Sequence, residues 1–71
     1  MAHFHKGDRV TWAWGAHRAH GVIAQRFVRR VRSTIDGTTV IRNACADEPA
    51  YLIRQEDGGR VLKSAGELEK A

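Results

Sequence analysis

The chain has 71 residues, of which 42% are hydrophobic and 28% charged, so it has room for one small folded domain and does not resemble a disordered chain. Its single cysteine excludes an internal disulfide and a four-cysteine zinc site. The net charge of +4 is unevenly distributed. Residues 1–42 contain eight basic and two acidic residues, whereas residues 43–71 contain four basic and six acidic residues. Such a distribution attracts polyanions or acidic protein surfaces.

The N-terminal part of the sequence predicts a disordered segment followed by one strand. Residues 1–5 show no anchoring pattern, and we expect them to form a disordered extension. A turn at Lys6-Gly7-Asp8 leads into a strand over residues 9–14, in which Val10, Trp12 and Trp14 share one face. Residues 15–20 are small or polar and predict a loop.

A long strand over residues 21–35 is the centre of the expected fold. Its inward-pointing residues should be Ile23, Phe27, Val31 and Ile35. Strict alternation would also bury Arg29. Because an unpaired buried guanidinium is costly, we expect a bulge or bend between Val28 and Arg30.

The first expected hairpin follows directly from this strand. Asp36-Gly37 predicts a two-residue turn into a strand over residues 38–42. That turn would place Val31 opposite Arg42 and Ser33 opposite Val40. Since neither pair is obviously favourable, a longer loop with a shifted register is the alternative.

A second hairpin is expected after a polar loop that ends at Pro49. It should join residues 50–55 to residues 60–64 through the turn sequence Glu56-Asp57-Gly58-Gly59. Pairing of Gln55 with Arg60 would set Ile53 opposite Leu62, and this apolar match favours that register.

These elements together predict an all-β fold, a small five-stranded SH3-like barrel over residues 6–68. Residues 64–68 should add a short C-terminal helical turn, with Leu68 closing one end of the barrel, and residues 69–71 should be flexible. An OB-type barrel is the alternative, but it usually needs a longer chain and a helix between its third and fourth strands.

Two sets of side chains could contact a partner. An aromatic rim of Trp12, Trp14 and Tyr51, with Phe27 as a further ring, could hold a methylated lysine or arginine, although the same rings could form the core. A stripe of arginines could follow a phosphate backbone, or could keep an exposed strand from pairing with other chains. The stripe consists of Arg18, Arg26, Arg29, Arg30, Arg32 and Arg42.

Metal binding and catalysis are not expected. The histidines occur as His3-x-His5 in the loose end and as His17-x-x-His20 in a loop, with no carboxylate or cysteine at a motif distance. Cys45 has small and acidic neighbours, and no histidine is near it in sequence. We therefore expect no metal, no cofactor and no enzymatic activity.

Several short motifs in order along the chain resemble the hypervirulence-associated Tudor-domain family. They occur at residues 6–15, 21–23, 42–44, 47, 49–51, 55–58 and 67–68, so the resemblance covers about residues 6–68. It implies an SH3-like, Tudor-type barrel with no established catalytic activity. The Tudor label implies recognition of peptides or methylated residues.

The expected function is that of a non-catalytic binding module. Protein or peptide recognition is the leading hypothesis, and nucleic-acid binding through the arginine stripe is the alternative. We expect a monomer or weak homodimer. Because no apolar run is long enough for a signal peptide or a membrane helix, we expect a cytoplasmic protein that does not bind membranes.

Overall fold

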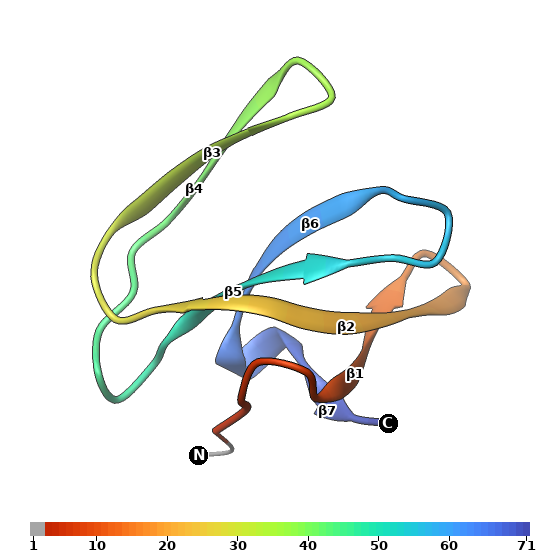
Figure 1. The fold of residues 1–71 in the computed structure, drawn as a ribbon, viewed down its shortest axis with the longest axis horizontal. Coiled ribbons are helices and arrows are strands. Elements are labelled where there is room, and N and C mark those ends of the chain that lie inside the picture. Colours follow the sequence, from red (N-terminus) through yellow and green to blue (C-terminus); the bar gives the residue numbers. More distant parts are fainter. Residues whose placement is uncertain (1–2) are drawn as a thin grey trace.

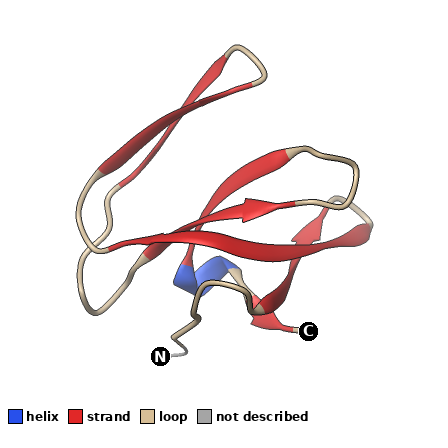
Figure 2. Ribbon diagram, in the orientation of Figure 1, coloured by secondary structure: helices blue, strands red, loops and turns tan. Residues whose placement is uncertain are grey.

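The computed structural model describes residues 3–71 and is built almost entirely of antiparallel strands (Figures 1 and 2). The elements are β1 (Arg9–Trp14), β2 (His17–Phe27), β3 (Val31–Ile35), β4 (Thr38–Arg42), β5 (Ala50–Arg54), β6 (Arg60–Ser64), the 3-10 turn η1 (Ala65–Glu67) and β7 (Glu69–Lys70). The prediction of an all-β fold with a short C-terminal helical turn is confirmed. Among residues 3–71, η1 is the longest helical segment, and none has the length or apolar character of a membrane span.

The strands form two sheets, and they do not close into a barrel. Five strands make one sheet in the order β6-β5-β2-β1-β7, while β3 and β4 pair only with each other. Figure 1 shows this hairpin beyond the end of β2, and both of its strands come close to β6 of the larger sheet. The all-β part of the prediction therefore holds, but residues 3–71 form seven strands in two sheets and not a closed five-stranded barrel.

The irregularity predicted between Val28 and Arg30 explains why the two sheets do not close into a barrel. These three residues lie outside any strand, and all three are exposed, so Arg29 remains in solvent. The bend separates β3 from β2, which prevents the long strand over residues 21–35 from joining both sheets without interruption. A second irregularity in β2, a register shift between Ile23 and Gln25 where it pairs with β5, was not apparent from the sequence.

The start of β2 differs from the expected loop at residues 15–20. Only Gly15 and Ala16 form the turn, and Gly15 has a φ of 58°, which suits glycine. His17 pairs with Trp14, and the pairing continues from there along the whole of β1. His17, Arg18 and His20 are polar because these positions of the strand are exposed, and not because they form a loop.

The first hairpin has the register that the two-residue turn predicts. Val31 lies opposite Arg42 and Ser33 opposite Val40, so the shifted register is not adopted. Asp36 and Gly37 have φ values of 51° and 78°, as a tight hairpin turn with two left-handed residues requires.

The second hairpin is one residue out of the expected register. Ile53 lies opposite Val61 and Arg54 opposite Arg60, so the expected pairing of Ile53 with Leu62 is wrong. The reason is that Gln55 belongs to the turn: its N–H donates to the Gly59 carbonyl oxygen at 2.8 Å. Turn closure thus overrides the apolar match.

The main core lies on one face of the larger sheet. Ile23 and Leu68 are buried there as expected, whereas Phe27, Val31 and Ile35 are only half-buried, Val31 and Ile35 because they lie in β3 beyond the bend. The full cluster consists of Phe4, Val10, Trp12, Ile23, Tyr51, Ile53, Ala65 and Leu68. Burial of these side chains supplies most of the driving force for folding.

The N-terminal segment is part of this core, contrary to the expected disordered extension over residues 1–5. Phe4 is 1% exposed, its ring meets that of Tyr51 edge-on at 5.5 Å, and its N–H donates to the Tyr51 hydroxyl at 3.0 Å. The N–H of His5 donates to the Asp8 carboxylate, and this hydrogen bond lowers the Asp8 pKa. Residues 1–2 of the expected extension lie outside the described residues.

The C-terminal residues 69–71 also differ from the expected flexible end. Glu69 and Lys70 form β7, which pairs with Thr11 and Val10 of β1. The Ala71 N–H donates to the Arg9 carbonyl oxygen at 3.1 Å. This short strand covers the outer edge of β1.

Glu67 ties η1 to both hairpins and should make stability depend on pH. Its carboxylate accepts the Ser64 N–H at 2.8 Å and lies 3.0 Å from Arg42 Nε. Burial by itself would raise the Glu67 pKa, but the Ser64 N–H and the Arg42 guanidinium together lower it below the ordinary value of 4.5. A depressed pKa in the folded state contributes stability above pH 4.5 that is lost as the pH falls through the folded-state pKa.

We therefore expect the melting temperature of the wild type to fall more than that of Glu67→Gln between about pH 6 and about pH 3. Thermal melts followed by circular dichroism at several pH values would measure this difference. Glu56→Gln, on an exposed turn, is the matched control and should follow the wild type. Parallel pH profiles for wild type and Glu67→Gln would contradict the assignment.

Candidate functional site

The structure does not bring the three expected aromatic residues together at an open rim. Trp12 and Tyr51 are 2% and 0% exposed, and the Tyr51 hydroxyl is occupied by the Phe4 N–H. Trp14 is 67% exposed at the end of β1. Alternation places Trp12 and Trp14 on one face, but the core covers that face only as far as Trp12. The buried rings therefore have no exposed face for a methylated side chain.

The expected arginine stripe is divided by ion pairs. Arg18 lies 2.8 Å from the Glu69 carboxylate and also donates to the Thr11 hydroxyl, and Arg42 lies 3.0 Å from Glu67. These two arginines have intramolecular partners, so their positive charge is largely compensated.

The remaining four arginines of the stripe surround the break between β2 and β3. We call them the arginine bend: Arg26, Arg29, Arg30 and Arg32. All four are exposed, and none forms an ion pair with any residue from 3 to 71. No acidic residue occurs between positions 25 and 35. The exposed side chains of Val28 and Ile41 add apolar surface, with Ile41 directly opposite Arg32.

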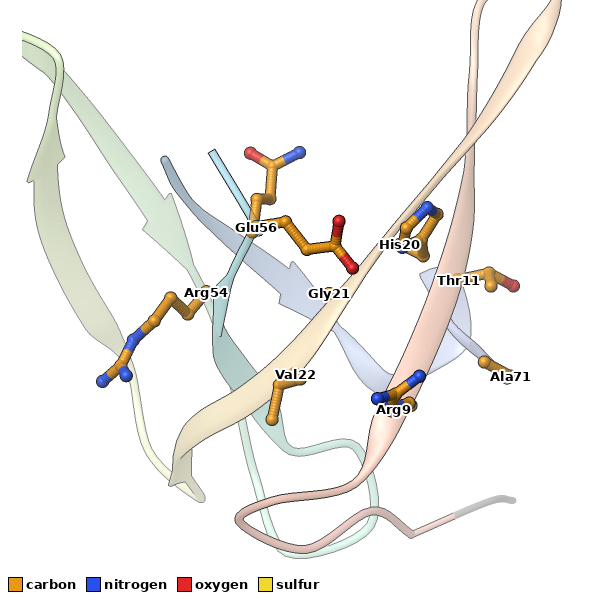
Figure 3. Close-up of a pocket in the computed structure, with 9 residues that line it drawn as sticks. Arg9, Thr11, His20, Gly21, Val22, Arg54, Glu56 and Ala71 are labelled. Atoms are coloured by element: carbon orange, nitrogen blue, oxygen red, sulfur yellow. The ribbon is translucent and has the colours of Figure 1, made fainter. Parts of the chain in front are cut away.

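A groove on the outer face of the larger sheet was not apparent from the sequence (Figure 3). It has a volume of about 620 Å³ and is open to solvent. Four separate segments line it: Arg9 and Thr11; His20, Gly21 and Val22; Arg54, Gln55 and Glu56; and Ala71. We call it the outer-sheet groove.

Strand register explains how these residues meet. Arg9 lies opposite Val22, and Val22 lies opposite Arg54, so the three side chains form one row across β1, β2 and β5. In Figure 3 the two arginines lie on either side of Val22, and the Glu56 carboxylate extends toward His20. The groove thus has an apolar floor and charged groups of both signs around it. Alternation within each strand indicates the outward residues, but only the pairing between distant strands places them together.

The histidines and the cysteine form no recognisable chemical site in the described part of the chain. His17 and His20 lie along β2 opposite Trp14 and Thr11, and Cys45 is exposed in the loop between β4 and β5. Within residues 3–71 there is no group of three histidine, cysteine, aspartate or glutamate side chains placed to hold a metal ion. The geometry therefore directs attention to the outer-sheet groove and the arginine bend.

Comparison with known proteins adds one finding. The family model described as "Hypervirulence associated proteins TUDOR domain" matches residues 7–68, nearly the whole chain, and confirms the resemblance seen in the motifs. Neither the curated proteins nor the solved structures contain a match.

Proposed function

Because the chain belongs to the family of hypervirulence-associated Tudor domains, we propose that it is a non-catalytic binding module that recognises a protein or peptide. Tudor-type domains are generally binding modules without catalytic activity. The family therefore supports the class of function, and the surface of this chain supports the kind of partner.

The outer-sheet groove is the observation that carries the proposal. Its floor is Val22, an apolar side chain that is 39% exposed, and hydrogen-bonding groups such as Thr11 and His20 surround it. A recognition site typically combines an apolar floor with a few polar groups that fix orientation. The groove crosses three strands and is open, which suits a length of extended peptide better than an enclosed small molecule.

A capture experiment with the purified domain tests the proposal. The domain is immobilised and exposed to an extract of its own cells, with and without nuclease, in wild-type form and as Val22→Glu. We expect a protein that stays bound after nuclease treatment and is lost with Val22→Glu. This substitution places a carboxylate between Arg9 and Arg54 at an exposed strand position, so it should block the groove without unfolding the domain.

Nucleic-acid binding is the second candidate, and the arginine bend is the observation that favours it. Four exposed arginines that have no acidic partner among residues 3–71 can contact successive phosphates. In the same experiment, capture that nuclease removes, that weakens steeply with salt, and that Arg30→Ala plus Arg32→Ala abolishes would replace the first proposal with the second. If neither Val22→Glu nor the double substitution Arg30→Ala plus Arg32→Ala changes the amount of protein or nucleic acid captured, both proposed functions fail.

A further inference from the structure

Three exposed arginines form a row across the outer face of the larger sheet. Arg9 on β1 is opposite Val22 on β2, Val22 is opposite Arg54 on β5, and Arg54 is opposite Arg60 on β6. We call Arg9, Arg54 and Arg60 the transverse arginine row. They are separated by 45 and 6 positions in the sequence, so only the sheet unites them.

The positive charges of the transverse arginine row are not compensated by ion pairs with described residues. None of its three arginines forms an ion pair with a residue between 3 and 71, whereas Arg18 on the same face is paired with Glu69. Like charges directly opposite each other in neighbouring strands destabilise a sheet. The Arg54 and Arg60 pair therefore works against folding, which is the pattern found where a surface is kept for a partner.

We propose that the outer-sheet groove binds an extended acidic segment of a partner protein. An apolar side chain of this segment contacts Val22, and two of its carboxylates pair with Arg9 and Arg54. This inference rests on the proposed function and adds the chemistry of the partner. Arg60, next in the row, would meet a further acidic residue at one end of the segment. Arginine suits this role because its planar guanidinium can hold a carboxylate through two hydrogen bonds.

The spacing of the row indicates the sequence pattern of the segment. Neighbouring strands lie about 4.8 Å apart, so Arg9 and Arg54, two strands apart, should be separated by about 10 Å at their Cα atoms. Side chains on one face of an extended peptide recur about every 6.6 Å. Three consecutive same-face residues span about 13 Å, and the long arginine side chains can cover the difference. The expected pattern is acidic-x-apolar-x-acidic.

Two features of the groove favour an acidic peptide over nucleic acid. Val22 offers apolar contact in the middle of the row, from which a phosphate backbone would gain nothing. Glu56 also lines the groove, and its carboxylate would repel a continuous run of phosphates. A peptide can place a neutral or basic residue beside Glu56, whereas a nucleic acid carries a charge at every phosphate.

A nuclear magnetic resonance titration tests the proposal. The ¹⁵N-labelled full chain is titrated with the synthetic peptide Gly-Ser-Asp-Ser-Leu-Ser-Asp-Ser-Gly and with two matched peptides, one with both Asp replaced by Lys and one with Leu replaced by Ser. We expect the first peptide to shift the amide signals of Thr11, Val22 and Arg54. The peptide with Leu replaced by Ser should bind more weakly, and the peptide with both Asp replaced by Lys should not bind. Arg54→Glu should weaken binding about tenfold through the loss of an ion pair and added repulsion. Arg32→Glu makes the same change of charge at an exposed arginine outside the groove, so it is the control and should leave the affinity for this peptide unchanged.

Thermal stability gives a second measurement that a merely structural role would not reproduce. Arg60→Glu converts a like-charge cross-strand pair into an opposite-charge pair with Arg54, so it should raise the melting temperature of the domain by about 2–5 °C. The same substitution should weaken binding of the peptide. Unchanged affinity for Arg54→Glu, equal binding of the Lys peptide, or larger shifts of the groove amides with a single-stranded oligonucleotide would overturn the proposal. The wider proposal of peptide recognition would survive such a result if Val22→Glu still abolished capture of a protein, and would fail separately if it did not.

Discussion

Replacing Phe4 with alanine should remove a large part of the free energy of unfolding of this domain, because Phe4 is a core side chain in a segment that the sequence predicts to be disordered. Truncation of a buried phenylalanine typically lowers the free energy of unfolding by about 3–5 kcal/mol. A chain of 71 residues has roughly 4–10 kcal/mol in total. Phe4 is 1% exposed and its ring packs edge-on against Tyr51, whereas its backbone N–H, which donates to the Tyr51 hydroxyl, is retained in the alanine variant. Loss of its ring would leave a cavity in the core.

Chemical denaturation followed by tryptophan fluorescence would measure this loss, since Trp12 belongs to the same core cluster. Phe4→Leu keeps an apolar side chain and should lose about 1–1.5 kcal/mol. His3→Ala changes the exposed neighbouring residue and should leave stability within about 0.5 kcal/mol of the wild type. A stable Phe4→Ala variant would show that the N-terminal segment does not belong to the folded unit.

Gly21→Ala should be the second most damaging single change, at about 2–3 kcal/mol. A Cβ at Gly21 would lie 2.6 Å from Ile53 Cγ2 and 2.7 Å from the Arg54 carbonyl oxygen. The first neighbour is a fully buried side chain, and the second is backbone in a paired strand, so neither can move away easily. The clash outweighs the stabilisation of up to about 1 kcal/mol that alanine usually brings when it replaces glycine in a strand.

The expected result is a melting temperature about 10–20 °C below that of the wild type. Gly66→Ala is the matched control, because a Cβ there would meet only the Glu48 carboxylate, at 3.3 Å, and this flexible side chain can shift. Gly66→Ala should therefore melt within a few degrees of the wild type. Equal melting temperatures for the two variants would mean that β2 and β5 approach each other less closely at Gly21 than the structure indicates.

The close approach at Gly21 also matters for the outer-sheet groove. Gly21 and Arg54 both line the groove, and the neighbouring pair of Val22 with Arg54 sets the position of the transverse arginine row. A variant that separates β2 from β5 should therefore weaken peptide binding as well as folding. Arg54→Glu leaves the backbone intact, so it is the better probe of binding alone.

Local signals in the sequence determined much of the secondary structure. Alternation predicted the strand at residues 9–14, and Asp36-Gly37 predicted the first hairpin and its register, because two left-handed residues leave the flanking strands only one pairing. The bend near Arg29 followed from the cost of burying a guanidinium. Each of these inferences depends on residues that are neighbours in the chain.

Only the tertiary structure decided the remaining features. Phe4 has no local pattern that marks it as core, since its partner Tyr51 lies 47 positions away. The second hairpin shifted by one residue because Gln55 closes the turn with Gly59, and this shift sets Arg54 opposite Arg60. The side-chain period of a strand is two, so a one-residue change in register alters every pair across the sheet. The arginine row and the groove are properties of that register, and for this reason the sequence supplied their residues but not their arrangement.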